Sequence, residues 1–175
     1  MDFTREIVAL RPAPPIIAAL TETLVETVAH GGSVSFMHPL APEAAAAFWS
    51  KSLDAAEAGE RVVLGALVAG EIAGTVTLLL DMPPNQQHRG EIAKMMTRVR
   101  HRGRGIARTL IVEAERLALT HGKTLLTLDT ATEDGAGPFY EKLGFRRAGM
   151  IPGYALTPFG TMSGTILYFK AIGTP

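Results

Sequence analysis

The 175-residue sequence contains no cysteine, and this absence excludes several kinds of site at once. Without thiols there can be no disulfide framework, no thiolate nucleophile and no cysteine-ligated metal. The 17 basic residues balance the 17 acidic ones, so the net charge gives no reason to expect nucleic acid or an anionic membrane surface as a partner. No apolar run approaches the roughly 20 residues that cross a bilayer. We therefore expect neither nucleic acid nor membrane as a partner, and no metal site.

The first residues carry charges early and contain no long apolar segment, which is not typical of a signal peptide. We therefore expect a cytoplasmic protein. The length suits one domain over residues 1–175 and is sufficient to bury a sizeable core.

Glycine and basic side chains gather in one stretch, from Glu91 to Ala118. It begins with an apolar run of strand length, Ile92–Met96, which is interrupted only by Lys94. Arg-His-Arg-Gly-Arg-Gly follows at residues 100–105. Apolar residues then recur at helical spacing, namely Ile106, Ala107, Leu110, Ile111, Ala114, Leu117 and Ala118. This pattern predicts a strand, a basic glycine-rich turn and an amphipathic helix.

Such a turn is well suited to binding an anion. The unpaired amides at a helix N-terminus, together with the peptide dipoles, favour negative charge there. Glycine lets the backbone approach a ligand closely, and arginine binds phosphate oxygens in a bidentate manner. We therefore expect a diphosphate as the ligand of this turn.

Two common phosphate motifs do not fit the turn. A dinucleotide fingerprint needs a third glycine where Arg108 stands, and no Gly-Lys-Ser/Thr of a P-loop follows. The turn does match R-x-x-G-x-G over residues 100–105, and it thereby resembles the acetyl-coenzyme A signature of the GNAT N-acetyltransferase superfamily. Residues 139–145, FYEKLGF, are similar to the second motif of that family, F-Y-x-x-x-G-F. Within the superfamily, residues 84–89 and 124–145 most resemble the tabtoxin-resistance-type acetyltransferases.

The resemblance covers about residues 60–170 and implies an α/β fold, with a mixed and mostly antiparallel twisted sheet flanked by helices on both faces. The sequence pattern is compatible with that order of elements. We expect strands over residues 3–11, 61–68, 72–80, 92–97, 123–130, 145–151 and 165–170. We expect helices over residues 16–29, 42–58, 106–118 and 135–143, with loops at 81–90 and 152–160.

The resemblance further implies acetyl-CoA as co-substrate. The backbone amides of residues 100–106 would hold its diphosphate, and its pantetheine arm would enter an opening between residues 95–97 and 125–129. The predicted coenzyme-binding residues are Met95, Met96, Thr97, Arg100, His101, Arg102, Gly103, Arg104, Gly105, Ile106 and Ala107. Many relatives have an asparagine where this chain has Glu133, so that coenzyme contact is not expected here.

By the same resemblance, Tyr140 would be the general acid that protonates the departing thiolate, since a phenol is protonated at neutral pH. Asp129 would hold the substrate ammonium group or accept its proton, and Glu91 would serve as a general base. A purely structural role stays open for each of them: aromatic packing for Tyr140, a turn cap for Asp129 and a solvent-facing strand end for Glu91.

Three further residues are candidates for contacts with the acceptor. The loop histidines His88 and His38 titrate in the range that a base requires. Tyr154 and the expected loop 152–160 would cover the acceptor site.

The predicted function is transfer of an acetyl group to the amine of a small molecule by direct attack in a ternary complex. The subgroup resemblance adds an amino-acid-like toxin or antibiotic as acceptor, hence a role in resistance. Two alternatives stay open, namely acetylation of a protein N-terminus or lysine, and a non-catalytic acetyl-CoA-binding protein. The sequence does not fix the oligomeric state, and a homodimer stays open.

Overall fold

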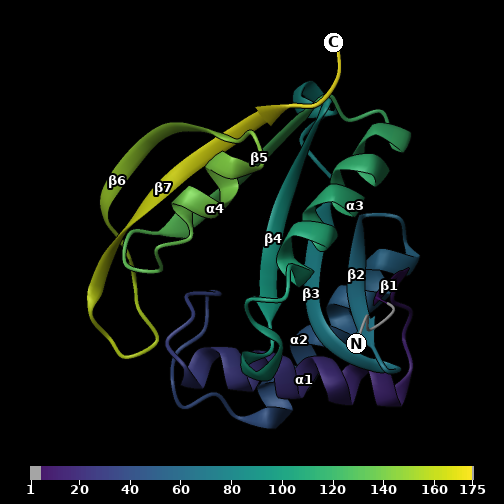
Figure 1. Ribbon diagram of the computed structural model, residues 1–175, viewed down its shortest axis with the longest axis vertical. Helices are drawn as coiled ribbons and strands as arrows, with labels where there is room; N and C mark the ends of the chain where they lie inside the picture. Colours follow the sequence, from purple (N-terminus) through teal and green to yellow (C-terminus); the bar gives the residue numbers. More distant parts are fainter. Residues whose placement is uncertain (1–4, 175) are drawn as a thin grey trace.

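The computed structural model describes residues 5–174, and all seven of their strands belong to one sheet in the order β1-β2-β3-β4-β5-β7-β6 (Figure 1). The strands are β1 (Arg5–Ala9), β2 (Arg61–Val68), β3 (Glu71–Leu79), β4 (Arg89–Thr97), β5 (Leu125–Ala131), β6 (Arg146–Leu156) and β7 (Met162–Ala171). The helices are α1 (Pro14–Ala29), α2 (Pro42–Glu57), α3 (Ile106–Thr120) and α4 (Gly137–Lys142), with short 3₁₀ turns η1 (Pro84–Gln86) and η2 (Val99–His101).

The predicted fold class is confirmed. The pairing of β4 with β5 is parallel, and the other strand pairs of the sheet are antiparallel. The expected first strand began at Phe3, and its first two residues lie outside the described residues.

Within residues 5–174 no helix is both long enough and apolar enough to span a bilayer, and the cytoplasmic location stays a prediction.

Helices cover both faces of the β1–β4 half of the sheet. Neighbouring residues of a strand point to opposite faces, so the apolar strands β2 and β3 present buried side chains to both layers of helices. Val63 and Ile72 pack with α1 and α2, around the fully buried Trp49. Their neighbours Leu64 and Ala73 pack with α3 on the other face. Burial on both faces explains why β2 and β3 read as an almost unbroken apolar run.

The sheet divides between its two parallel strands. β4 and β5 pair only over Arg89↔Leu125, Gly90↔Leu126 and Glu91↔Thr127, and beyond Glu91 the strands separate (Figure 1). β4 also contains a bulge there, since Thr75 pairs with Met96 while Thr77 pairs with Ala93. The β5-facing edge of β4 is therefore left without a strand partner over residues 92–97.

The C-terminal hairpin is longer than the sequence pattern predicted. Residues 152–156 belong to β6 and not to a loop, and the connecting turn covers residues 157–161. Pairing with β7 resumes at Ala155↔Ser163 after an irregularity. The proline at 152 is tolerated because β6 is the edge strand, where an amide need not donate to a neighbour.

Candidate active site

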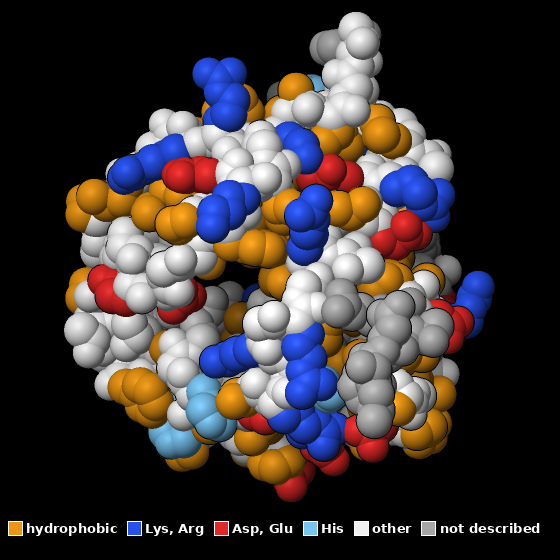
Figure 2. Space-filling model, in the orientation of Figure 1, with side chains coloured by type: hydrophobic (Ala, Val, Ile, Leu, Met, Phe, Trp, Pro, Cys, Tyr) orange, Lys and Arg blue, Asp and Glu red, His pale blue; other side chains and the backbone are white. Residues whose placement is uncertain are grey.

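Two adjoining hollows occupy the opening between β4 and β5. The large hollow has a volume of about 820 Å³ and the small hollow about 410 Å³, and we call the two together the cleft. They share the wall residues Thr97, Arg102, Ala107 and Phe139. Figure 2 shows the surface hollowed at this gap. The cleft therefore has room for an extended ligand that reaches both hollows.

The turn before α3 forms one wall of the small hollow. Gly103 and Gly105 have φ angles of +71° and +75°, a conformation that glycine adopts without strain. No side chain caps the N-terminus of α3. Among residues 5–174, no backbone carbonyl accepts a hydrogen bond from the amides of residues 103–108. A row of free amides at the positive end of a helix can bind an anionic group such as a diphosphate.

Most of the predicted coenzyme-binding residues line the cleft. They are Met95, Met96, Thr97, His101, Arg102, Gly103, Gly105, Ile106 and Ala107. Arg104 and Arg100 line neither hollow. The Arg100 guanidinium instead contacts the Glu71 carboxylate of β3 at 2.5 Å and donates from Nε to His101 Nε2 at 3.2 Å.

His101 is buried behind the turn. Burial lowers the pKa of its imidazole, and the nearby positive charges of Arg100, Arg104 and Arg98 lower it further. The neutral form is therefore favoured, and the ring adds no positive charge to the turn.

Tyr140, in α4, belongs to a buried cluster that contains residues of β2–β4 and also of β5 and β7. It is only 7% exposed and makes edge-to-face contacts with Phe139 and Phe145, at 5.0 and 5.8 Å between ring centroids. It also lines the large hollow. Burial raises the pKa of Tyr140 to about 12, and the charges of Asp134 and Asp129 act in the same direction. The phenol is thus held in its protonated form and can act as a proton donor beside the cleft.

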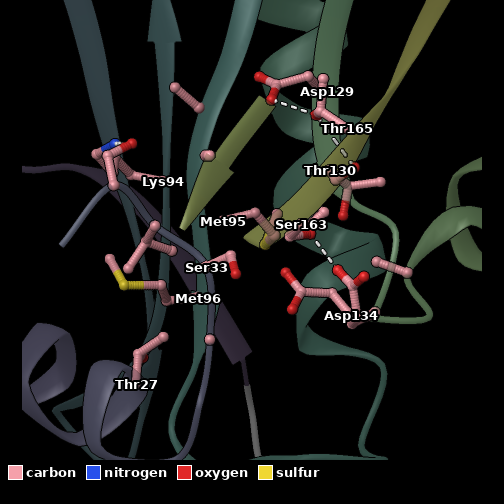
Figure 3. Close-up of a pocket in the computed structure, with 18 of the residues that line it drawn as sticks. Thr27, Ser33, Lys94, Met95, Met96, Asp129, Thr130, Asp134, Ser163 and Thr165 are labelled. Carbon is pink, nitrogen blue, oxygen red and sulfur yellow. Dashed lines mark hydrogen bonds between the residues drawn. The ribbon is translucent and has the colours of Figure 1, made fainter. Parts of the chain in front are cut away.

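The two predicted carboxylates line the large hollow from neighbouring strands. Thr165 Oγ1 donates to Asp129 Oδ2 at 2.8 Å, as Figure 3 shows. Glu91 is ion-paired with Arg89 at 3.2 Å, and Arg89 also donates to Thr127 at 2.8 Å. Asp129 therefore has the freer carboxylate of the two, while Glu91 is held by a fixed cation.

The structure separates the remaining candidates. Tyr154, 56% exposed, lines the large hollow from β6. His88 lines neither hollow, and its carbonyl accepts hydrogen bonds from the amides of Thr124 and Leu125. It therefore lies where the two parallel strands begin, whereas the cleft opens toward their ends. His38 is also outside the cleft wall, with its ring 5.1 Å from that of Phe159.

Several cleft residues were not predicted from the sequence. Lys94, Asp134 and Ser163 line the large hollow, as do residues 30–35 after α1. Burial raises the pKa of Asp134, and hydrogen bonds from Ser33 oppose this rise. The sequence did distinguish Lys94, because it is the one charged residue in the apolar run Ile92–Met96. No feature of the sequence distinguished Asp134, because Thr-Glu-Asp-Gly is typical of an ordinary turn.

Glu133 stands where relatives have an asparagine. It accepts a hydrogen bond from Ser163 Oγ, and this bond lowers the pKa of the carboxyl group. Its side chain is therefore held toward β7 as an anion, which is a poor replacement for an amide that would contact a negatively charged coenzyme. In residues 5–174, no group of three or more histidine and acidic side chains could hold a metal ion.

Comparison with known proteins adds a family and a fold. Residues 25–145 match the acetyltransferase (GNAT) family. The structure is similar to an N-acetyltransferase from Staphylococcus aureus Mu50 (TM-score 0.82, 16% identity, 97% of this chain and 99% of that one). It is also similar to yncA of Salmonella typhimurium, solved with its cofactor acetyl-CoA (TM-score 0.82, 17% identity, 98% and 96%). A third similar structure is the ribosomal-protein-alanine N-acetyltransferase of Brucella melitensis (TM-score 0.80, 18% identity, 95% and 99%).

Proposed function

The chain belongs to the acetyltransferase (GNAT) family of acetyl-CoA-dependent N-acetyltransferases, and from this premise we propose that it acetylates the amine of a small molecule by direct attack within a ternary complex. The observation that carries the proposal is one continuous cleft. It joins a row of free amides at the start of α3 to a protonated phenol, Tyr140, and an open carboxylate, Asp129.

The coenzyme would lie along both hollows. The amides of residues 103–108 would bind the diphosphate, assisted by the guanidinium of Arg102, which borders both hollows. The pantetheine arm would pair with the strand edge at residues 95–97, which has no β5 partner, as an extended chain adds to an open sheet. The thioester would then reach the large hollow near Tyr140.

The cleft supplies groups for the proton transfers of the reaction. Asp129, with Glu91 as the second candidate base, would accept a proton from the acceptor ammonium and leave a neutral amine. The amine nitrogen forms a bond to the thioester carbon, the carbon–sulfur bond breaks, and Tyr140 donates its proton to the departing thiolate. The second proton, which the nitrogen loses as it becomes an amide, returns to the Tyr140 phenolate. Tyr140 has a proton to donate because its phenol is protonated at neutral pH, with a pKa that burial raises to about 12.

The shape of the acceptor side favours a small molecule over a peptide. The loop after α1 contacts the β6–β7 turn, where the His38 amide donates to the Pro158 carbonyl at 2.8 Å. This contact joins the two segments that line the large hollow with residues 30–35 and 154–156, and it would limit the space for a continuous peptide. Tyr154 would contact the acceptor. An amino-acid-like toxin or antibiotic fits such a site. Acetylation of a protein, the reaction named for the Brucella structure, and coenzyme binding without catalysis are the two alternatives.

The test combines binding with turnover. Calorimetry should detect heat on titration with acetyl-CoA. Free thiol should then be released over time with some members of a panel of small amines. Faster acetylation of a peptide library, followed by mass spectrometry, would identify a protein acceptor instead. Binding without release of thiol in either assay would identify a non-catalytic protein, and no binding at millimolar acetyl-CoA would contradict the proposal altogether.

A further inference from the structure

Lys94 occupies the bulge of β4 at the opening of the sheet. Between Ala93 and Met96 two residues, Lys94 and Met95, oppose the single residue Val76 of β3. Lys94 has a φ angle of +51°, which costs a non-glycine residue roughly 1–3 kcal/mol. A bulge also redirects the side chain that it carries, and here that side chain lines the large hollow.

The ammonium group of Lys94 is oriented but not neutralised. Nζ donates to Ser35 Oγ at 3.1 Å and lies 5.9 and 5.7 Å from the ring centroids of Phe36 and Phe48. Within residues 5–174 no carboxylate approaches it to ion-pair distance. Since an ammonium group has three donors, two of them are left for a ligand. Arg89, the neighbouring cation on the same strand, is instead ion-paired with Glu91.

Across the cleft the charges are negative. Figure 3 shows Lys94 on one side, and Asp129 and Asp134 on the other. Burial lowers the pKa of Lys94, and the charges of Asp129 and Glu91 oppose this shift by favouring the ammonium form. A fixed cation in a cleft that accepts an amine would repel a simple alkylammonium ion, because like charges disfavour each other at short range. An acceptor that carries its own anionic group removes this conflict.

We propose that Lys94 binds a carboxylate of the acceptor, so that the acceptor is a zwitterion with its amine directed at Asp129 and its carboxylate at Lys94. This inference rests on the proposed function, since it specifies the substrate of the same cleft. Lys94 is then a specificity-determining residue, and Ser35 with the two phenylalanine rings holds its ammonium group in place.

The experiment compares two sets of acceptors that differ only in the carboxylate. Thiol release is measured with the common L-amino acids and with their carboxamides, for the unchanged protein and for Lys94→Met and Lys94→Arg. We expect the unchanged protein to prefer the free amino acid. Lys94→Met should raise KM for the best amino acid about 10- to 100-fold, the effect of losing a hydrogen bond to a charged group, and change KM for its carboxamide less than about twofold. Lys94→Arg should retain most of the preference.

The outcomes separate this inference from the function on which it rests. Turnover of carboxamides at rates equal to those of amino acids, or an equal loss for both in Lys94→Met, would overturn the inference and leave the acetyltransferase function intact. Failure to acetylate any amine, despite binding of acetyl-CoA, would contradict the proposed function and the inference with it. Unchanged acetyl-CoA affinity and melting temperature in Lys94→Met would exclude misfolding as the cause of a selective loss.

Discussion

The two ends of the cleft are built in different ways. The small hollow is formed largely by one contiguous segment, residues 97–108, and offers backbone amides. The large hollow collects residues from α1 and its following loop, β4, β5, α4 with the segment before it, and the β6–β7 hairpin. The small hollow can recognise a coenzyme that does not vary, through backbone amides that every residue carries. The large hollow can take different acceptors through changes of single side chains, while the fold stays the same.

This division predicts that substitutions at the two ends affect different constants. Changes in the large hollow should alter turnover and acceptor KM while acetyl-CoA affinity stays constant. Changes in the turn before α3 should alter acetyl-CoA affinity.

The largest effect is expected for Tyr140→Phe. Loss of the proton donor should lower kcat about 100- to 1,000-fold, within the range for general acid catalysis, and change KM for acetyl-CoA less than about threefold because the ring still packs. Steady-state thiol release measures both constants. Tyr168→Phe is the matched control, because Tyr168 belongs to the same buried cluster and lines neither hollow. Small and equal changes of kcat in the two variants would contradict the role of Tyr140 as proton donor.

A smaller effect is expected for Asp129→Asn. The amide oxygen can still accept the hydrogen bond from Thr165, so the local structure should persist. Loss of the charge should lower kcat/KM for the amine about 10- to 100-fold, as for a hydrogen bond to a charged group. Calorimetry should find acetyl-CoA affinity unchanged. Asp81→Asn, on an exposed loop outside the cleft, should behave as the unchanged protein, and a fall in coenzyme affinity with Asp129→Asn would contradict the separation of the two ends.

The glycines allow a comparison at nearly equal backbone geometry. Gly103 and Gly122 have φ angles of +71° and +72°, and a Cβ atom at either would meet nothing within 4 Å. Alanine at each should therefore lower the free energy of unfolding similarly, by about 1–2 kcal/mol. Only Gly103→Ala should also weaken acetyl-CoA binding, about tenfold, because the added methyl group lies beside the diphosphate site. Equal coenzyme affinities in the two variants would mean that the turn does not contact the coenzyme.

The smallest effect distinguishes two neighbouring arginines. Arg102→Gln should weaken acetyl-CoA binding about threefold, the scale of an exposed charge interaction. Arg100→Gln should change it less than about 1.5-fold, because the Arg100 side chain is held by Glu71 and His101 and lines neither hollow. Calorimetry at constant ionic strength resolves the difference. A larger loss for Arg100→Gln would mean that its side chain turns toward the coenzyme on binding.

The sequence predicted the fold and the local structure of residues 91–118 well, and the reason is physical. The strand, turn and helix of residues 91–118 are specified by local periodicity and by glycine at positions 103 and 105. The hairpin was predicted too short, since an edge strand tolerates the proline at 152 that suggested a loop. His88 was named as an acceptor contact because of its residue type, and its place at the far end of the parallel strands follows from strand direction, which residue type does not encode.

By itself the sequence determined the contiguous part of this protein: an apolar strand, a basic glycine-rich turn and a helix, whose consecutive free amides are able to bind an anion. Only the tertiary structure decided the composition of the large hollow. There β4 and β5 part after three paired residues, a bulge turns Lys94 into the gap, and Asp129 and Asp134 lie across from it. Those positions depend on strand register and on packing between segments far apart in the chain, which no local pattern of residues specifies.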